Sequence, residues 1–177
     1  NLSEYTKTIT IPATHEDAGG NALPVRSISE YGFSKITYLE TVTLPATLES
    51  IPTTAFEGCK RIKAFYMSEL GDDEQKFASD TYTVVDGTVL STMYGETTLF
   101  LVPPAKTTGT YYVPYGVTVI GSRTFLKDNK LQFSTIVIPS TVKTIEPDAF
   151  VGCSALKHVI FETATESFAR KPDKKDG

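Results

Sequence analysis

Residues 136–161 read IVIPSTVKTIEPDAFVGCSALKHVIF, and their apolar spacing recurs in residues 42–67, VTLPATLESIPTTAFEGCKRIKAFYM. In both copies a short apolar strand ends at a proline, Pro45 in one and Pro139 in the other. Eight later positions match at equal distances from these prolines: Leu48, Ile51, Ala55, Phe56, Gly58, Cys59, Ile62 and Phe65, and Val142, Ile145, Ala149, Phe150, Gly152, Cys153, Leu156 and Val159. Chance does not explain this agreement, so one structural unit has been copied.

Two other stretches follow the same template. One has Val25, Ile28, Phe33, Leu39 and Val42, preceded by a strand at residues 7–12 and an inserted loop at residues 15–24 that is rich in glycine and asparagine. The other has Val117, Ile120, Phe125 and Leu131, with Lys127 and Asp128 where other copies carry glycine and cysteine. The chain therefore holds about four copies of a repeat of about 23 residues.

A repeat this short cannot bury its own core, so neighbouring copies must stack. The sequence predicts a right-handed, mainly β leucine-rich-repeat solenoid with short parallel strands and short helical or 3-10 turns. The rings of Phe33, Phe56, Phe125 and Phe150 should lie one above another in a shared interior. Gly58 occupies a tight turn, where a positive φ is expected.

Residues 68–110 break the period and are predicted as an insertion. Alternating runs at residues 88–94 and 97–102, separated by Gly95 and Glu96, indicate a β-hairpin that projects from the stack. We therefore expect one repeat domain over residues 1–163, followed by a flexible polar tail over residues 164–177. No convincing end cap is recognisable, so exposed ends are expected.

The pattern I-x-I-P-x-x-V-x-x-I-x-x-x-A-F-x-G-C-x-x-L-x-x-V, best kept at residues 136–161 and 42–67, resembles the BspA-like class of leucine-rich repeats. The likeness covers roughly residues 7–161, and residues 85–90, 97–99 and Pro103 are similar to a hairpin insertion common in that family. The resemblance implies a surface-attached or secreted, extracellular protein of a host-associated bacterium or a protist, acting in adhesion to host or bacterial partners. It implies no catalytic residues.

Composition excludes several other classes of function. A net charge of −4, a pI near 5.2 and scattered basic residues argue against nucleic-acid binding. No run approaches the roughly 20 apolar residues of a membrane span. His15 and His158 are the only histidines, and neither accompanies a nucleophile or a ligand set, so we identify no catalytic residue, no cofactor and no metal site.

Three groups of residues could suggest a functional site, but a structural or solvent-exposed role is favoured for each. His15 with Glu16 and Asp17 could form a weak metal site, but a solvated loop is favoured. Asp72, Asp73 and Glu74 lack the spacing of a calcium loop and read as a solvated acidic turn. Cys59 and Cys153 occupy one offset of two copies, at least one rung apart and beyond the roughly 7 Å reach of a disulfide, so both are predicted to be buried free thiols.

Alternate side chains of stacked strands form outward-facing rows. The prolines set the register, which predicts a first row of Thr10, Thr43, Tyr66, Tyr112, Val137 and Ile160, and a second row of Thr8, Thr41, Ala64, Thr110, Thr135 and His158. Thr43, Tyr66, Tyr112, Val137, His158 and Ile160 are the candidate binding face, because the first row becomes apolar toward the C-terminus. The alternative is that these residues are simply good exposed strand formers.

The sequence thus predicts a non-catalytic extracellular or cell-surface module that binds a protein partner. A second hypothesis is a carbohydrate-recognising domain in which Tyr66 and Tyr112 stack on sugar rings. A third is a structural spacer for an anchoring or catalytic region at either end. The ligand's identity does not follow from the residues.

Overall fold

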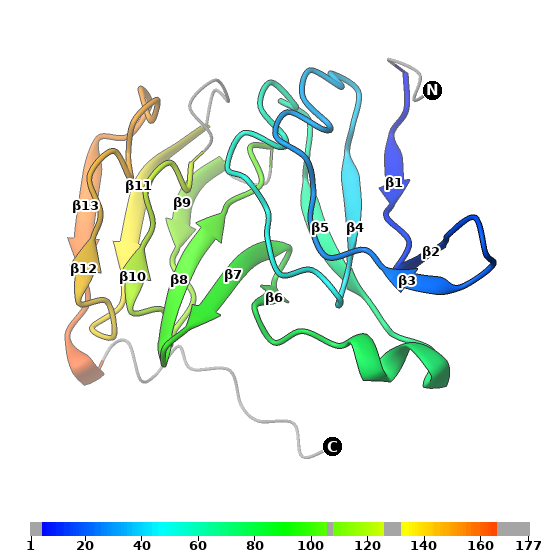
Figure 1. The fold of residues 1–177 in the computed structure, drawn as a ribbon. Coiled ribbons are helices and arrows are strands. Elements are labelled where there is room, and N and C mark those ends of the chain that lie inside the picture. The colour runs from blue at the N-terminus through cyan, green and yellow to red at the C-terminus, as the bar shows by residue number, and fades with distance from the viewer. Residues whose placement is uncertain (1–4, 106–107, 126–131, 166–177) are drawn as a thin grey trace.

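A computed structural model describes residues 5–105, 108–125 and 132–165. Its strands lie side by side, from β1 at one end to β13 at the other, and form one stack (Figure 1). This arrangement confirms the predicted repeat solenoid. The polar tail from residue 166 onward, and Lys127, Asp128 and Leu131 of the third copy, lie outside the described residues.

The front of the stack carries six parallel strands, arranged as two separate sheets. The first sheet is β1 (Thr8–Thr10), β4 (Thr41–Pro45) and β5 (Ala64–Ser68), and the second is β9 (Thr108–Tyr112), β11 (Gln132–Ile138) and β13 (His158–Phe161). Ile9 lies beside Val42, and Ile136 beside Val159, in parallel register. The predicted parallel pairing of these strands is therefore confirmed, and the six strands are those that carry the six residues of each predicted row.

The inserted segment does not project from the stack as predicted but is built into it. It forms β6 (Tyr82–Val85), β7 (Thr88–Met93) and β8 (Glu96–Leu101), and β8 then pairs in parallel with β10 (Val119–Ile120), which pairs with β12 (Thr144–Ile145). The hairpin turn lies at Tyr94 and Gly95, whose φ values are 51° and 79°, one residue before the predicted turn. Leu99 and Leu101 are fully buried, so burial of apolar side chains holds the hairpin in the stack.

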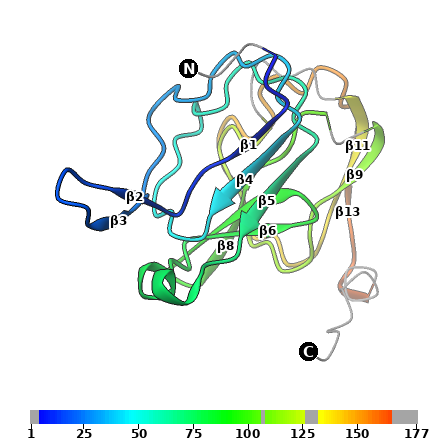
Figure 2. The ribbon, with the colours of Figure 1, turned by 90° about the vertical axis from the view of Figure 1, so that its right-hand side faces the viewer.

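The loop predicted at residues 15–24 is instead a short antiparallel hairpin of β2 (Thr14–Glu16) and β3 (Ala22–Pro24), which extends away from the body (Figure 2). Its turn is closed by the Asp17 carboxylate, which accepts hydrogen bonds from the backbone of Gly19 and Asn21. These bonds, that from the Asn21 side chain above all, lower the pKa of Asp17. Asp17 therefore has a structural role as the turn's hydrogen-bond acceptor.

The acidic turn forms the 3-10 helix η1 (Asp72–Phe77). The Glu74 carboxylate accepts hydrogen bonds from the Gly71 backbone at the start of this helix and from the Thr14 hydroxyl of β2. Among the described residues, no group of three or more histidine, cysteine, aspartate or glutamate side chains is placed to hold a metal ion. Within the same residues, no helix is both long enough and apolar enough to cross a membrane.

Stacked aromatic rings form the centre of each half of the core. Phe33 stacks on Phe56 with ring centroids 5.5 Å apart, and Phe125 stacks on Phe150 at 5.6 Å, as the repeat predicted. The buried residues separate into two clusters, one around Phe56 and Phe65 and the other around Phe125 and Phe133. Gly58 has a φ of 79°, which confirms the predicted tight turn.

The last strand leaves apolar side chains exposed. Val159 occupies an inward position of the template, yet 44% of it is exposed, and Phe161 is 66% exposed. The reason is that β13 pairs with β11 on one edge, and no described strand covers its other edge. The expected exposed end is therefore present, and an inward position of the template is not buried where no further described strand follows.

Both cysteines are free thiols, as predicted. Cys59 is fully buried and its thiol donates to the Phe33 carbonyl, whereas Cys153 in the last repeat is half-buried. Burial raises the pKa of both, that of Cys153 to about 11. At neutral pH both thiols therefore carry their protons, and they serve as small core side chains.

We expect the protein to lose stability as the pH rises above about 10, partly because of Tyr111. Its ring is buried, and burial holds the pKa of its phenol well above the usual range. The unfolded chain releases this proton at the ordinary pKa of about 10 while the folded chain keeps it. The stabilisation is thus fully present below that pH and declines by up to about 1.4 kcal/mol per pH unit above it.

Urea unfolding of the wild type and of Tyr111→Phe at several pH values between neutral and strongly alkaline checks this expectation. Tyr111→Phe should show a shallower alkaline decline in the free energy of unfolding, whatever its stability at neutral pH. An identical alkaline slope in the two proteins would contradict the assignment to Tyr111. The raised pKa values of Cys59, Cys153 and Tyr82 should also contribute to the alkaline decline in both proteins.

Candidate binding face

The strand register aligns the two predicted rows within each front sheet. Thr10, Thr43 and Tyr66 are neighbours across β1, β4 and β5. Tyr112, Val137 and Ile160 are neighbours across β9, β11 and β13, and in the second row Thr110, Thr135 and His158 align in the same way. Along β5, Phe65 is buried between Ala64 and Tyr66. Successive side chains of a strand point to opposite faces, so Ala64 and Tyr66 point outward where Phe65 points inward.

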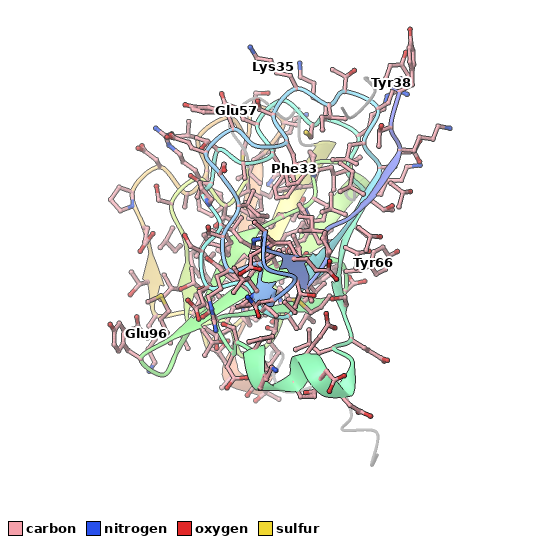
Figure 3. The ribbon with its side chains drawn as sticks, turned by 45° about the vertical axis from the view of Figure 1, so that its right-hand side comes forward. Phe33, Lys35, Tyr38, Glu57, Tyr66 and Glu96 are labelled. Atoms are coloured by element: carbon pink, nitrogen blue, oxygen red, sulfur yellow. The ribbon has the colours of Figure 1, made fainter. Side chains whose placement is uncertain are left out.

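Three apolar or aromatic side chains of the first row face solvent. Tyr66 and Tyr112 are each 53% exposed, and Ile160 is 49% exposed. In Figure 3 the side chain of Tyr66 lies on the outer side of the sheet, away from Phe33 in the interior. Large aromatic surfaces carrying a polar hydroxyl suit contacts with another molecule.

Val137 does not belong to the exposed face. It is only 6% exposed, although its position in the strand is the same as that of Tyr66. The difference arises because β11 is the middle strand, with Tyr112 on one side of Val137 and Ile160 on the other. Larger neighbours on both flanking strands leave little of a valine accessible, so the predicted exposure of Val137 is wrong.

The first row is also interrupted. β5 and β9 belong to different sheets, so the outward row consists of one segment that ends at Tyr66 and another that begins at Tyr112. The insertion lies between these segments in sequence, and its Gly87 carbonyl accepts a hydrogen bond from the Phe65 N–H. The continuous apolar strip predicted from the repeats is therefore two shorter patches.

The second row is mainly polar. Its His158 is exposed, and Thr43 of the first row is partly exposed. The Thr41 hydroxyl donates to that of Thr8 across the strands. Directly before β4 and β5, the Lys63 ammonium donates to the Glu40 carboxylate at 2.6 Å, and this bond lowers the pKa of Glu40.

A hollow of about 510 Å³ lies where the row is interrupted, and the sequence analysis did not foresee it. It is lined by Lys63, Ala64, Phe65, Tyr66, Met67, Val84, Asp86 and Gly87, and we refer to it as the β5 slot. Its one sequence signal is the loss of the repeat period after residue 67. Tyr66 is thus both a face residue and part of this slot.

Parallel strands piled with their inward residues in register, and an outward row of side chains on one face, define this chain as a leucine-rich-repeat solenoid. The model of the BspA type leucine rich repeat region matches residues 22–78 and 109–171, in six copies. The chain belongs to this family. The six matched copies exceed the four recognised in the sequence. No curated protein sequence matches the chain.

Solved structures of other repeat proteins are similar to this one. A leucine-rich repeat protein from Eubacterium ventriosum is 18% identical with a TM-score of 0.51, over 80% of this chain and 41% of that one. A leucine rich cell surface protein from Faecalibacterium prausnitzii is 16% identical with a TM-score of 0.42, over 94% of this chain and 62% of that one. The chain thus spans about two-fifths to three-fifths of these proteins, and the first of them shows the shared fold.

Proposed function

We propose that this chain is a non-catalytic binding module, extracellular or on the cell surface, that contacts a protein partner on a host or bacterial surface. Its binding face comprises Thr43, Tyr66, Tyr112, His158 and Ile160, without Val137. The extracellular setting rests on the likeness to BspA-type repeats.

The observation that carries this proposal is the exposure of Tyr66, Tyr112 and Ile160 on outward positions of the front strands. A rigid β framework fixes these side chains before binding, so little further ordering is required. Tyrosine is enriched among the residues that contribute most to protein interfaces.

Replacing the two tyrosines should abolish most of the binding. The chain is immobilised and incubated with host-cell and bacterial surface extracts, and a protein partner captured by the wild type is purified and identified. We expect Tyr66→Ala/Tyr112→Ala to bind that purified partner about tenfold or more weakly in a titration, since hot-spot truncations cost about 2 kcal/mol or more.

Tyr94→Ala is the matched control, because Tyr94 is 99% exposed but lies at the hairpin turn, outside the face. It should bind like the wild type. Equal binding by the double variant and the wild type would contradict the proposed face, and capture of no specific protein would favour the spacer hypothesis.

A carbohydrate partner remains the second candidate, because two tyrosine rings exposed at 53% could stack on sugar rings. A glycan array probed with the wild type and the double variant separates the two. Binding to defined glycans that disappears in the double variant would replace the protein partner by a sugar.

A further inference from the structure

β5 is an edge strand, although it lies in the middle of the stack. It pairs with β4 on one edge, and on its other edge lies the β5 slot, bounded by β5 and by Val84, Asp86 and Gly87. An unpaired edge is a template for another strand, and proteins normally cover or interrupt it. In this chain the insertion covers it only in part.

Strand alternation determines which backbone groups face the slot. Thr43 directs its carbonyl toward the β1 side, where it accepts from the Ile11 N–H, so Val42 and Leu44 direct their backbone groups toward β5. In that register Ala64, Tyr66 and Ser68 bond to β4, and Phe65 and Met67 face the other way. The hydrogen bond from the Phe65 N–H to the Gly87 carbonyl, 2.9 Å long, agrees with this assignment.

One backbone hydrogen bond is present on this edge of β5 among the described residues, that to Gly87. The Phe65 carbonyl and the N–H and carbonyl of Met67 therefore face the slot, and no described strand is paired with them; β6 borders the far side of the slot through Val84. A polypeptide in extended conformation presents donors and acceptors at the spacing that matches these three groups.

Gly87 closes the slot at one end. With a φ of 73°, it lies so near β5 that a Cβ atom at this position would be 3.0 Å from the Cβ of Ala64. Farther along β5, Met67 and Val84 contribute apolar lining to the slot. Gly87 therefore approaches β5 most closely at Ala64, and the lining of the slot continues along β5 to Met67.

We propose that the β5 slot binds an extended segment of a protein partner, which adds as a strand along β5 from Phe65 to Met67. This inference rests on the proposed protein-binding function and identifies the form of the ligand. Main-chain hydrogen bonds to Phe65 and Met67 supply the binding, and an inward apolar side chain of the added segment contacts Met67 and Val84. Tyr66, which borders the slot and faces outward, joins the added strand to the binding face.

A peptide selection tests the proposal. A phage library of random peptides of about twelve residues is selected on the wild-type chain and depleted on Met67→Pro, which lacks the N–H that faces the slot. Proline is tolerated on a strand edge whose N–H is unpaired, so the variant keeps the pairing with β4. Met67→Leu, which keeps the N–H, is the matched control.

We expect recovered peptides, made synthetically, to bind Met67→Leu within about threefold of the wild type, since leucine keeps both the N–H and an apolar side chain of similar volume, and to bind Met67→Pro about tenfold or more weakly. In the wild type they should also slow hydrogen exchange of the Met67 amide by about tenfold or more, a reading that does not depend on the proline variant folding. Failure to enrich any peptide, equal binding to a folded Met67→Pro, or unchanged exchange at Met67 would overturn the proposal.

Tyr112 separates this inference from the proposed function, since it belongs to the face and does not line the slot. A partner lost in Tyr112→Ala but retained in a folded Met67→Pro would leave the face proposal intact and refute strand addition. Peptides that bind through Met67, together with no surface partner that depends on Tyr66 or Tyr112, would support strand addition and contradict the face proposal.

Discussion

Phe56→Ala should destabilise the protein by about 3–5 kcal/mol, the cost found when a fully buried phenylalanine is truncated. Phe56 has no exposed surface and joins two other rings, stacking on Phe33 and meeting Phe65 edge-on at 5.3 Å. Its removal leaves a cavity in the N-terminal cluster and loses both ring contacts. Urea unfolding followed by circular dichroism measures the change.

Phe161→Ala is the control for this experiment, because it removes the same side chain from a site that is 66% exposed on β13. We expect its free energy of unfolding to lie within about 0.5 kcal/mol of the wild type. Similar losses in the two variants would mean that the phenylalanines of the repeat are not stacked inside.

Leu99→Ala and Leu101→Ala should each cost about 2–5 kcal/mol, although both residues belong to an insertion that interrupts the repeats. Both are fully buried on β8, Leu101 in the N-terminal cluster and Leu99 in the C-terminal one. A hairpin that projected into solvent would lose far less, so these variants test whether the insertion is part of the core.

Met93→Ala, at the tip of the same hairpin and 56% exposed, provides the comparison and should stay within about 0.5 kcal/mol of the wild type. Thermal and urea unfolding of the three variants together map burial along the hairpin. A loss below about 1 kcal/mol for both leucine variants would contradict the placement of β8 in the stack.

The repeat could be predicted because its chemistry is local and copied. Phe33 with Phe56, and Phe125 with Phe150, follow directly from equal spacing, and so does the parallel pairing of the strands that carry Ile9 and Val42. Glycine at a turn with positive φ, as at Gly58, is also visible in sequence.

The placement of the hairpin was not predictable from alternation alone, since alternating residues suit an exposed hairpin and a buried one equally. A signal was present nonetheless: Leu99, Phe100, Leu101 and Val102 form a continuous apolar run, which is typical of a strand covered on both faces. The same run explains why β8 pairs with β10 instead of ending at the surface.

For the candidate face, the sequence predicted which residues are neighbours across the strands, but it did not predict how exposed each of them is. Register depends on the period, whereas the burial of Val137 depends on the size of its neighbours on β9 and β13. The β5 slot could not be placed from the sequence for a related reason. It lies where no strand is paired with the free edge of β5, and the loss of the repeat period after residue 67 shows only that the copies are interrupted there.

The hairpin contributes residues to both hydrophobic clusters, Val89 and Leu101 to one and Leu90 and Leu99 to the other. Because the hairpin connects both clusters, changes in the repeats and changes in the hairpin should have different consequences during evolution. Whole copies can be gained or lost on either flank, because each copy contacts only its neighbours. A change inside the hairpin alters the packing of both clusters at once. The hairpin should therefore vary less in length than the two sets of repeats that it connects.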